Sequence, residues 1–268
     1  MTRDDDPQRD LGYFGPQSMT WRIHGEPVTM IGGLRALLLQ ALHPAAMRLL
    51  QERSNFQDDP WKRLESTVTY VGTVSFARRA DVDAASSRVR AVHHALGIDD
   101  PEQLAWVHLC LVDSFLTAAR AAGLPVRRAD ADRYVAEQAL AASFVGVEPA
   151  RVPHTAGELA EGIAAMRPRL RCIPEARAAA RVVVAPPMPV PGRYALPARL
   201  GWTAASALAV GLMPRWALRL YRLPVLPGRS VATAAGLRAL RGAVRTLPAQ
   251  YREGPLYRDA KQRAAAAG

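Results

Sequence analysis

The stretch DPEQLAWVHLCLVDSFLTAARAAG, residues 100–123, decides the fold class. Asp100 and Pro101 form a helix start, because Asp accepts hydrogen bonds from the first turn and Pro fits the first helical position. Apolar residues then recur at helical spacing around His108 and Phe115. Gly123 follows the last of them and is typical of a helix end. The stretch therefore predicts a long helix with an apolar face.

The same helical periodicity recurs along the rest of the chain, which is rich in the helix formers Ala, Leu and Arg. No strand-like alternation and no internal repeat is visible. Pro44 interrupts one predicted helix, over residues 33–53, and should kink it. We therefore expect an all-α, multi-helix bundle that forms a single domain over residues 1–268. Further helices are predicted over 61–80, 81–96, 129–146, 175–184, 198–211, 214–221 and 230–245. Another should follow the capping box Thr155–Glu158. Asp58-Asp59-Pro60 marks the start of the first of these helices, and Gly97 marks the end of the second. An irregular N-terminal arm is expected over 1–30 and a proline-rich loop over 186–197, and a basic tail over 247–268 ends the chain.

The chain carries a formal charge of +11 and has a sequence pI near 10.5. A net positive charge of this size favours an anionic partner, such as nucleic acid, a membrane surface or an anionic cofactor. No nucleic-acid-reading motif is present, and aromatic residues do not interleave with the arginines, so nucleic acid is not expected. The charged N-terminus lacks an apolar signal region, and Arg or Pro breaks the longest apolar stretches. We expect a cytoplasmic protein, and the apolar segment 200–213 leaves peripheral membrane contact open.

Several common kinds of site have no support in the sequence. The two cysteines, Cys110 and Cys172, show no disulfide framework, and Cys110 fits a small core residue within an apolar run. No Cys or His pair has the spacing of a structural zinc site. The HExxH, GxSxG, P-loop and GxGxxG motifs are absent, so nucleophilic hydrolysis is not indicated.

Histidines are the best candidates for chemistry. His43, His93 and His108 lie on different predicted helices, whereas His94 points toward solvent. A histidine on an apolar helix face is most often a core residue that bonds a carbonyl. Three such residues in one chain favour something for them to bind, because an unpartnered buried imidazole is costly. A metal site formed by His24, His43 and His108 stays open as one interpretation.

A haem fits these residues better than a bare metal ion does. It needs one axial imidazole on a rigid helix, apolar walls and cations for two propionates. His93 lies beside the apolar stripe of its helix, formed by Val82, Ala85, Val89, Val92 and Leu96, and is the predicted iron ligand. Arg63 and Arg90 are the predicted propionate partners, because guanidinium binds carboxylate through paired hydrogen bonds. Taken singly, each arginine would more often belong to a solvated helix face.

These residues fall within blocks that resemble a known family. The blocks are FGPQSMTWRIHGEP, GGLRALLLQALHPAAM, SNFQDDPWKRLESTVTYVGTVSF, RVRAVHHALG and LAWVHLCLVDSFL, with a weaker YRLPVLPGR. Together they are similar to the MpaB-type oxygenases, the family that includes the catalytic domain of the latex-clearing rubber oxygenases. The resemblance implies a mostly helical, globin-like protein that binds haem b and performs oxygen-dependent oxidation.

The resemblance also assigns roles to single residues. Arg90 and His93 match the family's Arg-x-x-His element, whose histidine is the proximal iron ligand. Arg63 and Thr67 match a distal Arg-x-x-Lys-Thr element, but Ser66 stands where the rubber enzymes have lysine. This departure argues against rubber as the substrate.

His43 and His108 match family histidines, and we expect one of them near the distal face. The expected function is a haem b-dependent oxygenase that acts on a small hydrophobic substrate with dioxygen or peroxide. Thr67 would hydrogen-bond the oxygen, and His43 or His108 would serve as acid or base. Two alternatives are a haem-binding or sensing protein without turnover, and a haem-free helical protein that binds anionic membrane.

Overall fold

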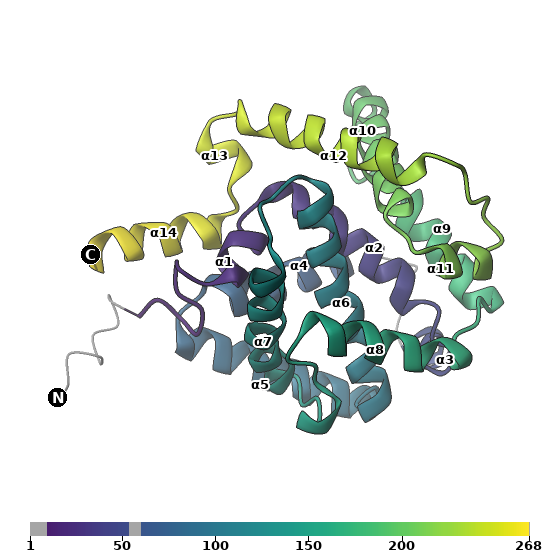
Figure 1. The fold of residues 1–268 in the computed structure, drawn as a ribbon, viewed down its shortest axis with the longest axis horizontal. Coiled ribbons are helices and arrows are strands. Elements are labelled where there is room, and N and C mark those ends of the chain that lie inside the picture. Colours follow the sequence, from purple (N-terminus) through teal and green to yellow (C-terminus); the bar gives the residue numbers. More distant parts are fainter. Residues whose placement is uncertain (1–9, 54–59, 268) are drawn as a thin grey trace.

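A computed structural model describes residues 10–53 and 60–267, and these residues form helices and loops without a strand (Figure 1). The all-α prediction is therefore confirmed. The α-helices are α1 (Met19–His24), α2 (Met30–Gln40), α3 (Pro44–Arg53), α4 (Pro60–Phe76), α5 (Arg79–Leu96), α6 (Pro101–Ala121), α7 (Arg128–Phe144), α8 (Ala156–Met166), α9 (Pro174–Val184), α10 (Gly192–Gly211), α11 (Arg215–Leu220), α12 (Arg229–Arg245), α13 (Ala249–Arg252) and α14 (Pro255–Ala267). Three short 3-10 helices are η2 (Pro27–Thr29), η3 (Pro149–Arg151) and η4 (Arg167–Arg169).

Helix α6, the stretch quoted first, lies at the centre of the bundle. It packs most extensively along α2, and it also contacts α1, α7, α8 and α12 (Figure 1). Trp106, Cys110 and Phe115 of α6 are buried in the main hydrophobic core. The helix is also long and apolar enough to cross a membrane by length and composition, but 67% of its apolar window is buried against the other helices.

The predicted helix ends are largely confirmed. An Asp100 side-chain oxygen accepts a hydrogen bond from the Gln103 N–H at 2.9 Å, which caps the start of α6. Gly97 and Gly123 adopt positive φ angles of 62° and 78° after α5 and α6, a conformation that glycine tolerates best. Thr155 caps α8 by accepting from the Glu158 N–H.

Three predicted boundaries are wrong. Residues 33–53 form two helices rather than one kinked helix, because Pro44 lacks an N–H and begins α3 instead of interrupting it. The N-terminal arm contains α1, which Ser18 caps. The proline-rich loop ends early, since α10 begins at Gly192 and includes Pro197. The predicted helix start at Asp58 and Asp59 lies outside the described residues.

The C-terminal basic tail is also helical. Helix α14 packs against α4, and its Arg263 is buried. The Arg263 guanidinium donates to the carbonyl oxygens of Asp10 and Phe76 and pairs with Asp259. The tail thus ties the N-terminal residues to the end of α4. The sequence of this segment shows that it is basic, but it does not show the hydrogen bonds to Asp10 and Phe76.

Candidate functional site

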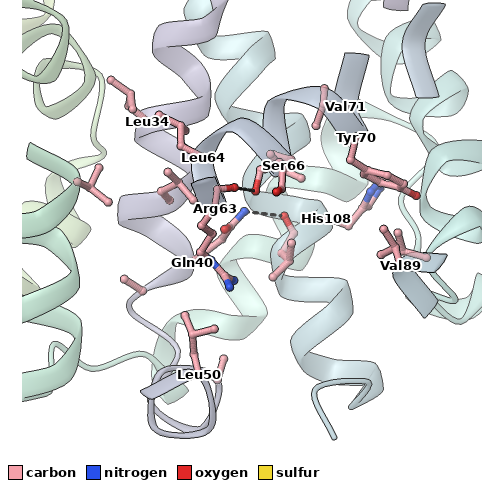
Figure 2. A pocket seen from close by; sticks show the side chains of 18 of the residues that line it. Leu34, Gln40, Leu50, Arg63, Leu64, Ser66, Tyr70, Val71, Val89 and His108 are labelled. Carbon is pink, nitrogen blue, oxygen red and sulfur yellow. Dashed lines mark hydrogen bonds between the residues drawn. The ribbon is translucent and has the colours of Figure 1, made fainter. Parts of the chain in front are cut away.

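A cavity of about 480 Å³ opens between α2, α4, α5, α6 and α9. Its size falls within the range of about 300–1,000 Å³ usual for small-molecule and cofactor sites. Figure 2 shows Arg63, Ser66 and Tyr70 of α4 and His108 of α6 around this space. Most of the lining is aliphatic or aromatic. The polar side chains that interrupt it are His24, Gln40, Arg63, Ser66, Thr67, Tyr70, Ser75, His93, Gln103, His108, Tyr134 and Gln138.

Helix α5 supplies one wall of the cavity. The apolar stripe predicted along this helix divides into two halves. Val82 and Ala85 are buried, as expected, whereas Val92 is 54% exposed and lines the cavity with Leu96 and His93. The second half of the stripe therefore presents apolar surface to a space that a ligand can fill.

His93 lies in this wall near the C-terminus of α5. Its Nδ1 is buried and has no hydrogen-bond partner among the described residues. Burial lowers the pKa of His93, and the positive charge of Arg63 lowers it further, with a smaller opposing effect from Asp99. The ring is therefore neutral near pH 7, which is the state that binds a metal.

Arg63 faces the cavity from the second turn of α4 (Figure 2). No hydrogen bond or ion pair joins its guanidinium to any residue that the structure describes. Desolvation lowers the pKa of Arg63, although solvent reaches much of its side chain, because protein surrounds the cavity into which it points. Arg63 is thus an unpaired cation beside a mostly apolar space.

His108 lies on α6 and also lines the cavity. It is buried, and burial lowers its pKa to about 4. Its Nε2 has no hydrogen-bond partner among the described residues. His108 and His93 thus provide two buried imidazole nitrogens without partners in the lining of one cavity.

Thr67 and Ser66 line the cavity from α4, as the sequence predicted for Thr67. The Thr67 hydroxyl donates to the Arg63 carbonyl oxygen at 3.0 Å, and the Ser66 hydroxyl donates to the Lys62 carbonyl oxygen at 2.8 Å. Both hydroxyl protons are therefore used within the helix. In this arrangement Thr67 offers the lone pairs of its hydroxyl oxygen to a ligand.

The structure places His43 outside the cavity lining. His43 lies in the turn between α2 and α3, where its Nδ1 accepts from the Ala46 N–H at 3.2 Å. Its Nε2 lies 3.5 Å from a carboxylate oxygen of Glu102. His43 therefore caps α3 and contacts the start of α6, and the sequence could not show this because Pro44 ends one helix and begins the next.

Arg90 is also absent from the cavity lining. Its guanidinium donates to the Phe144 carbonyl oxygen at 2.7 Å and to the Ser87 hydroxyl at 3.1 Å. Phe144 is the last residue of α7, so Arg90 satisfies a helix-terminal carbonyl and joins α5 to α7. Of the two predicted propionate partners, only Arg63 faces the cavity.

His24 belongs to a buried polar network that the sequence did not predict. Its Nδ1 lies 2.7 Å from the Ser75 hydroxyl, and its Nε2 lies 2.8 Å from the Tyr134 hydroxyl. Ser75 donates its own proton to the Val71 carbonyl oxygen, so it must accept from His24 Nδ1–H. His24 Nε2 therefore accepts from Tyr134. Burial lowers the pKa of His24 to about 3, in agreement with this neutral tautomer.

The three-histidine metal site is wrong. His24 uses both ring nitrogens in hydrogen bonds, and His43 does not line the cavity that His24 and His108 share. Within residues 10–53 and 60–267, no three His, Cys, Asp or Glu side chains come together in a way that could hold a metal ion.

The lining residues that were not predicted from the sequence include Tyr70, Trp61 and Trp202. Tyr70 follows Arg63 and Thr67 at helical spacing, and that spacing was the available signal. Trp61 and Trp202 stack edge to face at 4.8 Å and join the start of α4 to α10. No local pattern links these two tryptophans, since 141 positions separate them.

Comparison with known proteins gave one match. The chain matched no curated protein and no solved structure. Residues 21–246 match the family described as "ER-bound oxygenase mpaB/B'/Rubber oxygenase, catalytic domain". This match covers most of the chain and includes every cavity residue named above. The all-α chain therefore belongs to the MpaB and rubber oxygenase catalytic-domain family.

Proposed function

We propose that the chain is a haem b-dependent oxygenase that acts on a small hydrophobic substrate with dioxygen or a peroxide. Membership of an oxygenase family supports the reaction class. One structural observation supports the cofactor: His93 and His108 both line the mostly apolar cavity, and the buried nitrogens His93 Nδ1 and His108 Nε2 have no hydrogen-bond partner among the described residues. An unsatisfied buried polar atom costs about 1–3 kcal/mol, so a ligand that satisfies it gains binding energy.

The residues present fit a haem. Only one or two axial side chains are needed, and His93 is neutral and borne on a rigid helix. Arg63 is an unpaired cation in the same lining and would bind a propionate. The apolar side chains of Val92 and Leu96, which line the cavity, would contact a flat apolar ring. When bound, haem supplies an iron centre at which dioxygen or a peroxide reacts.

The chain's own residues would then orient the substrate and move protons. His108 is neutral near pH 7, so it would accept a proton rather than donate one in its resting state. Thr67 would accept a hydrogen bond through its lone pairs, since its proton is held by the Arg63 carbonyl oxygen. The mostly apolar lining excludes water and favours a small apolar substrate.

Rubber is not the substrate that we propose. Ser66 occupies the position of the lysine expected in rubber-cleaving relatives, and its short hydroxyl donates back to the helix. No amine therefore reaches the cavity from this position. Thr67 and His108, which also line the cavity, would supply polar contacts to the reacting molecules.

The test begins with the protein purified from cells supplied with a haem precursor. The proposal predicts a Soret band, one haem per chain, and oxygen consumption that rises when apolar alkenes or lipids are added. A haem-loaded protein that consumes no oxygen with any of these substrates would instead be a haem carrier or sensor. A protein that retains no haem and shows no Soret band would contradict the proposal at its first step.

A further inference from the structure

The net positive charge of the chain arises in one segment. Residues 176–252 contain no Asp and no Glu. This segment alone carries +12, whereas the whole chain carries +11, so the rest of the chain is close to neutral. The positive residues are Arg177, Arg181, Arg193, Arg199, Arg215, Arg219, Arg222, Arg229, Arg238, Arg241, Arg245 and Arg252.

Most of the exposed large apolar side chains lie in the same segment. Among the described residues, nine of the thirteen large apolar side chains that are exposed fall between positions 190 and 251. Exposed apolar side chains in a segment without acidic residues are unusual for a region that contacts only water. The nine are Val190, Tyr194, Leu196, Leu200, Leu223, Leu226, Val231, Leu247 and Tyr251.

The outer face of α10 combines both properties. Leu196 and Leu200, one helical turn apart, are 67% and 63% exposed, and the exposed Thr203 and Ala207 continue their row. Exposed Arg193 and Arg199 lie on either side of this row. We call the surface formed by residues 193, 196, 199, 200, 203 and 207 the outer face of α10.

The opposite face of the same helix belongs to the protein interior. Trp202 lines the cavity, stacks on Trp61, and donates from its indole N–H to the Val183 carbonyl oxygen at 3.0 Å. Ser206 donates to the Val184 carbonyl oxygen and is buried. The helix is therefore held in place from inside, and its outer face packs against no described part of the chain.

We propose that the outer face of α10 docks on the surface of an anionic phospholipid bilayer. Leucines between arginines are the pattern of a helix that lies in the membrane interface, with apolar side chains among the acyl chains and guanidinium groups among the phosphates. A second copy of this chain is a poor alternative occupant, because it would bring another +12 segment against the first.

Docking on this face would have a consequence for the cavity. Because Trp202 and Leu200 lie on the same helix, the cavity wall would rest directly behind the membrane-facing surface. A hydrophobic substrate dissolved in the bilayer would then be close to the site. This second step rests on the proposed function, whereas docking itself does not.

The experiment measures co-sedimentation of the purified full chain with vesicles, whatever its haem content. Vesicles of phosphatidylcholine with about 30% phosphatidylglycerol are compared with vesicles of phosphatidylcholine alone. The proposal predicts binding to the anionic vesicles, weaker binding to the neutral ones, and loss of most binding in about 0.5 M NaCl. Equal binding to both vesicles, or binding to neither, would overturn it.

Matched variants locate the surface. Arg193→Gln with Arg199→Gln should weaken binding about thirtyfold, at about fivefold per arginine. Leu196→Ser with Leu200→Ser should weaken it about tenfold or more. The control pair, Leu140→Ser with Arg88→Gln, changes the same residue types on α7 and α5 and should bind like the wild type.

Two further results would overturn the proposal. One is vesicle binding that both α10 variants retain, since the surface would then lie elsewhere. The other is a concentration-dependent dimer that the leucine variant abolishes, because the face would then join two copies. Circular dichroism and thermal unfolding of each variant confirm that the fold is unchanged. Haem content and oxygen consumption report on the proposed function separately.

Discussion

At the scale of single residues, the cavity lining keeps its histidines neutral by burying them. His24 and His108 have pKa values lowered to about 3 and about 4, and burial is the cause of both shifts. A neutral imidazole accepts or donates one hydrogen bond at each nitrogen, as His24 does with Tyr134 and Ser75. The cavity lining therefore favours neutral histidines, which hold a proton at one ring nitrogen, over positively charged ones.

These pKa values make the stability of the chain depend on pH. Above about pH 7 both histidines are neutral in the folded and the unfolded chain, so they contribute no pH dependence. As pH falls below about 6.5, the unfolded chain takes up protons that the folded chain cannot. The free energy of unfolding should therefore fall by up to about 1.4 kcal/mol per pH unit for each histidine.

Urea denaturation between about pH 6.5 and 5 measures this slope. His108→Gln removes one of the two groups and should reduce the slope by about one proton. His154→Gln, which changes an exposed histidine that lies outside the cavity lining, is the control variant. A His108→Gln slope equal to that of the wild type would show that His108 titrates normally in the folded chain.

The two arginines predicted as propionate partners should now behave differently. Arg63→Gln removes the unpaired cation in the cavity lining and should weaken haem binding about 10- to 100-fold, the effect of losing a hydrogen bond to a charged group. Arg90→Gln removes a bond to the end of α7 and should lower the free energy of unfolding by about 1 kcal/mol, with haem binding unchanged. Haem titrations and urea denaturation of both variants test this, and the reverse pattern would assign the propionate to Arg90.

The sequence predicted the cavity residues in part. Arg63, Thr67, His93 and His108 line the cavity, as expected from their helices and from the family resemblance. His43 was misplaced because the turn before Pro44 rotates it away from the helix face on which it was counted.

The polar network at His24 could not be predicted from local spacing. It joins residues 51 and 110 positions from His24, namely Ser75 and Tyr134. A helical pattern identifies which face a side chain lies on, but not which distant side chain meets it.

At the scale of helices, the contact between α2 and α6 is close enough to require glycine at one position. A Cβ atom at Gly32 would lie 2.6 Å from the Ser114 carbonyl oxygen of α6. Close by, the buried guanidinium of Arg35 pairs with Asp113 at 2.7 Å and donates to the Ser114 hydroxyl at 2.6 Å. The absence of a side chain at Gly32 brings the backbones together and sets the geometry of this ion pair.

Adjacent glycines of α2 provide a matched test of that close approach. Gly32→Ala should lower the free energy of unfolding by about 1–3 kcal/mol, because the methyl group overlaps backbone that cannot move easily. Gly33→Ala should raise it by up to about 1 kcal/mol, since a Cβ there meets nothing within 4 Å and alanine favours helix. Urea denaturation of both variants checks this, and equal effects of the two substitutions would contradict the packing described for α2 and α6.

Helix existence was more predictable than helix ends. Periodicity identified α4 to α12, and Asp100, Thr155, Gly97 and Gly123 marked ends that the structure confirms. Helix α14 was read as a basic tail because its charged residues suit solvent. The bonds of Arg263 to Asp10 and Phe76 become visible only when the two ends of the chain are brought together.

At the scale of the whole molecule, the cavity and the net positive charge lie mainly in different parts of the chain. Most of the cavity lining comes from residues before position 175, the part of the chain that is nearly neutral, and α9 and Trp202 of α10 complete it from the basic segment. The positive charge and most exposed apolar side chains lie after position 175. Helix α10 belongs to both regions, because its Trp202 lines the cavity and its outer face is the proposed membrane surface.

The central claim is that the cavity binds haem through His93, and a haem titration of three chains tests it most directly. Wild type and His94→Ala should each bind one haem b with the same Soret band, because His94 is exposed on the same helix and does not line the cavity. His93→Ala should lose the band or shift it, with the helical content unchanged. A His93→Ala chain that binds haem with the affinity and spectrum of the wild type would contradict the account.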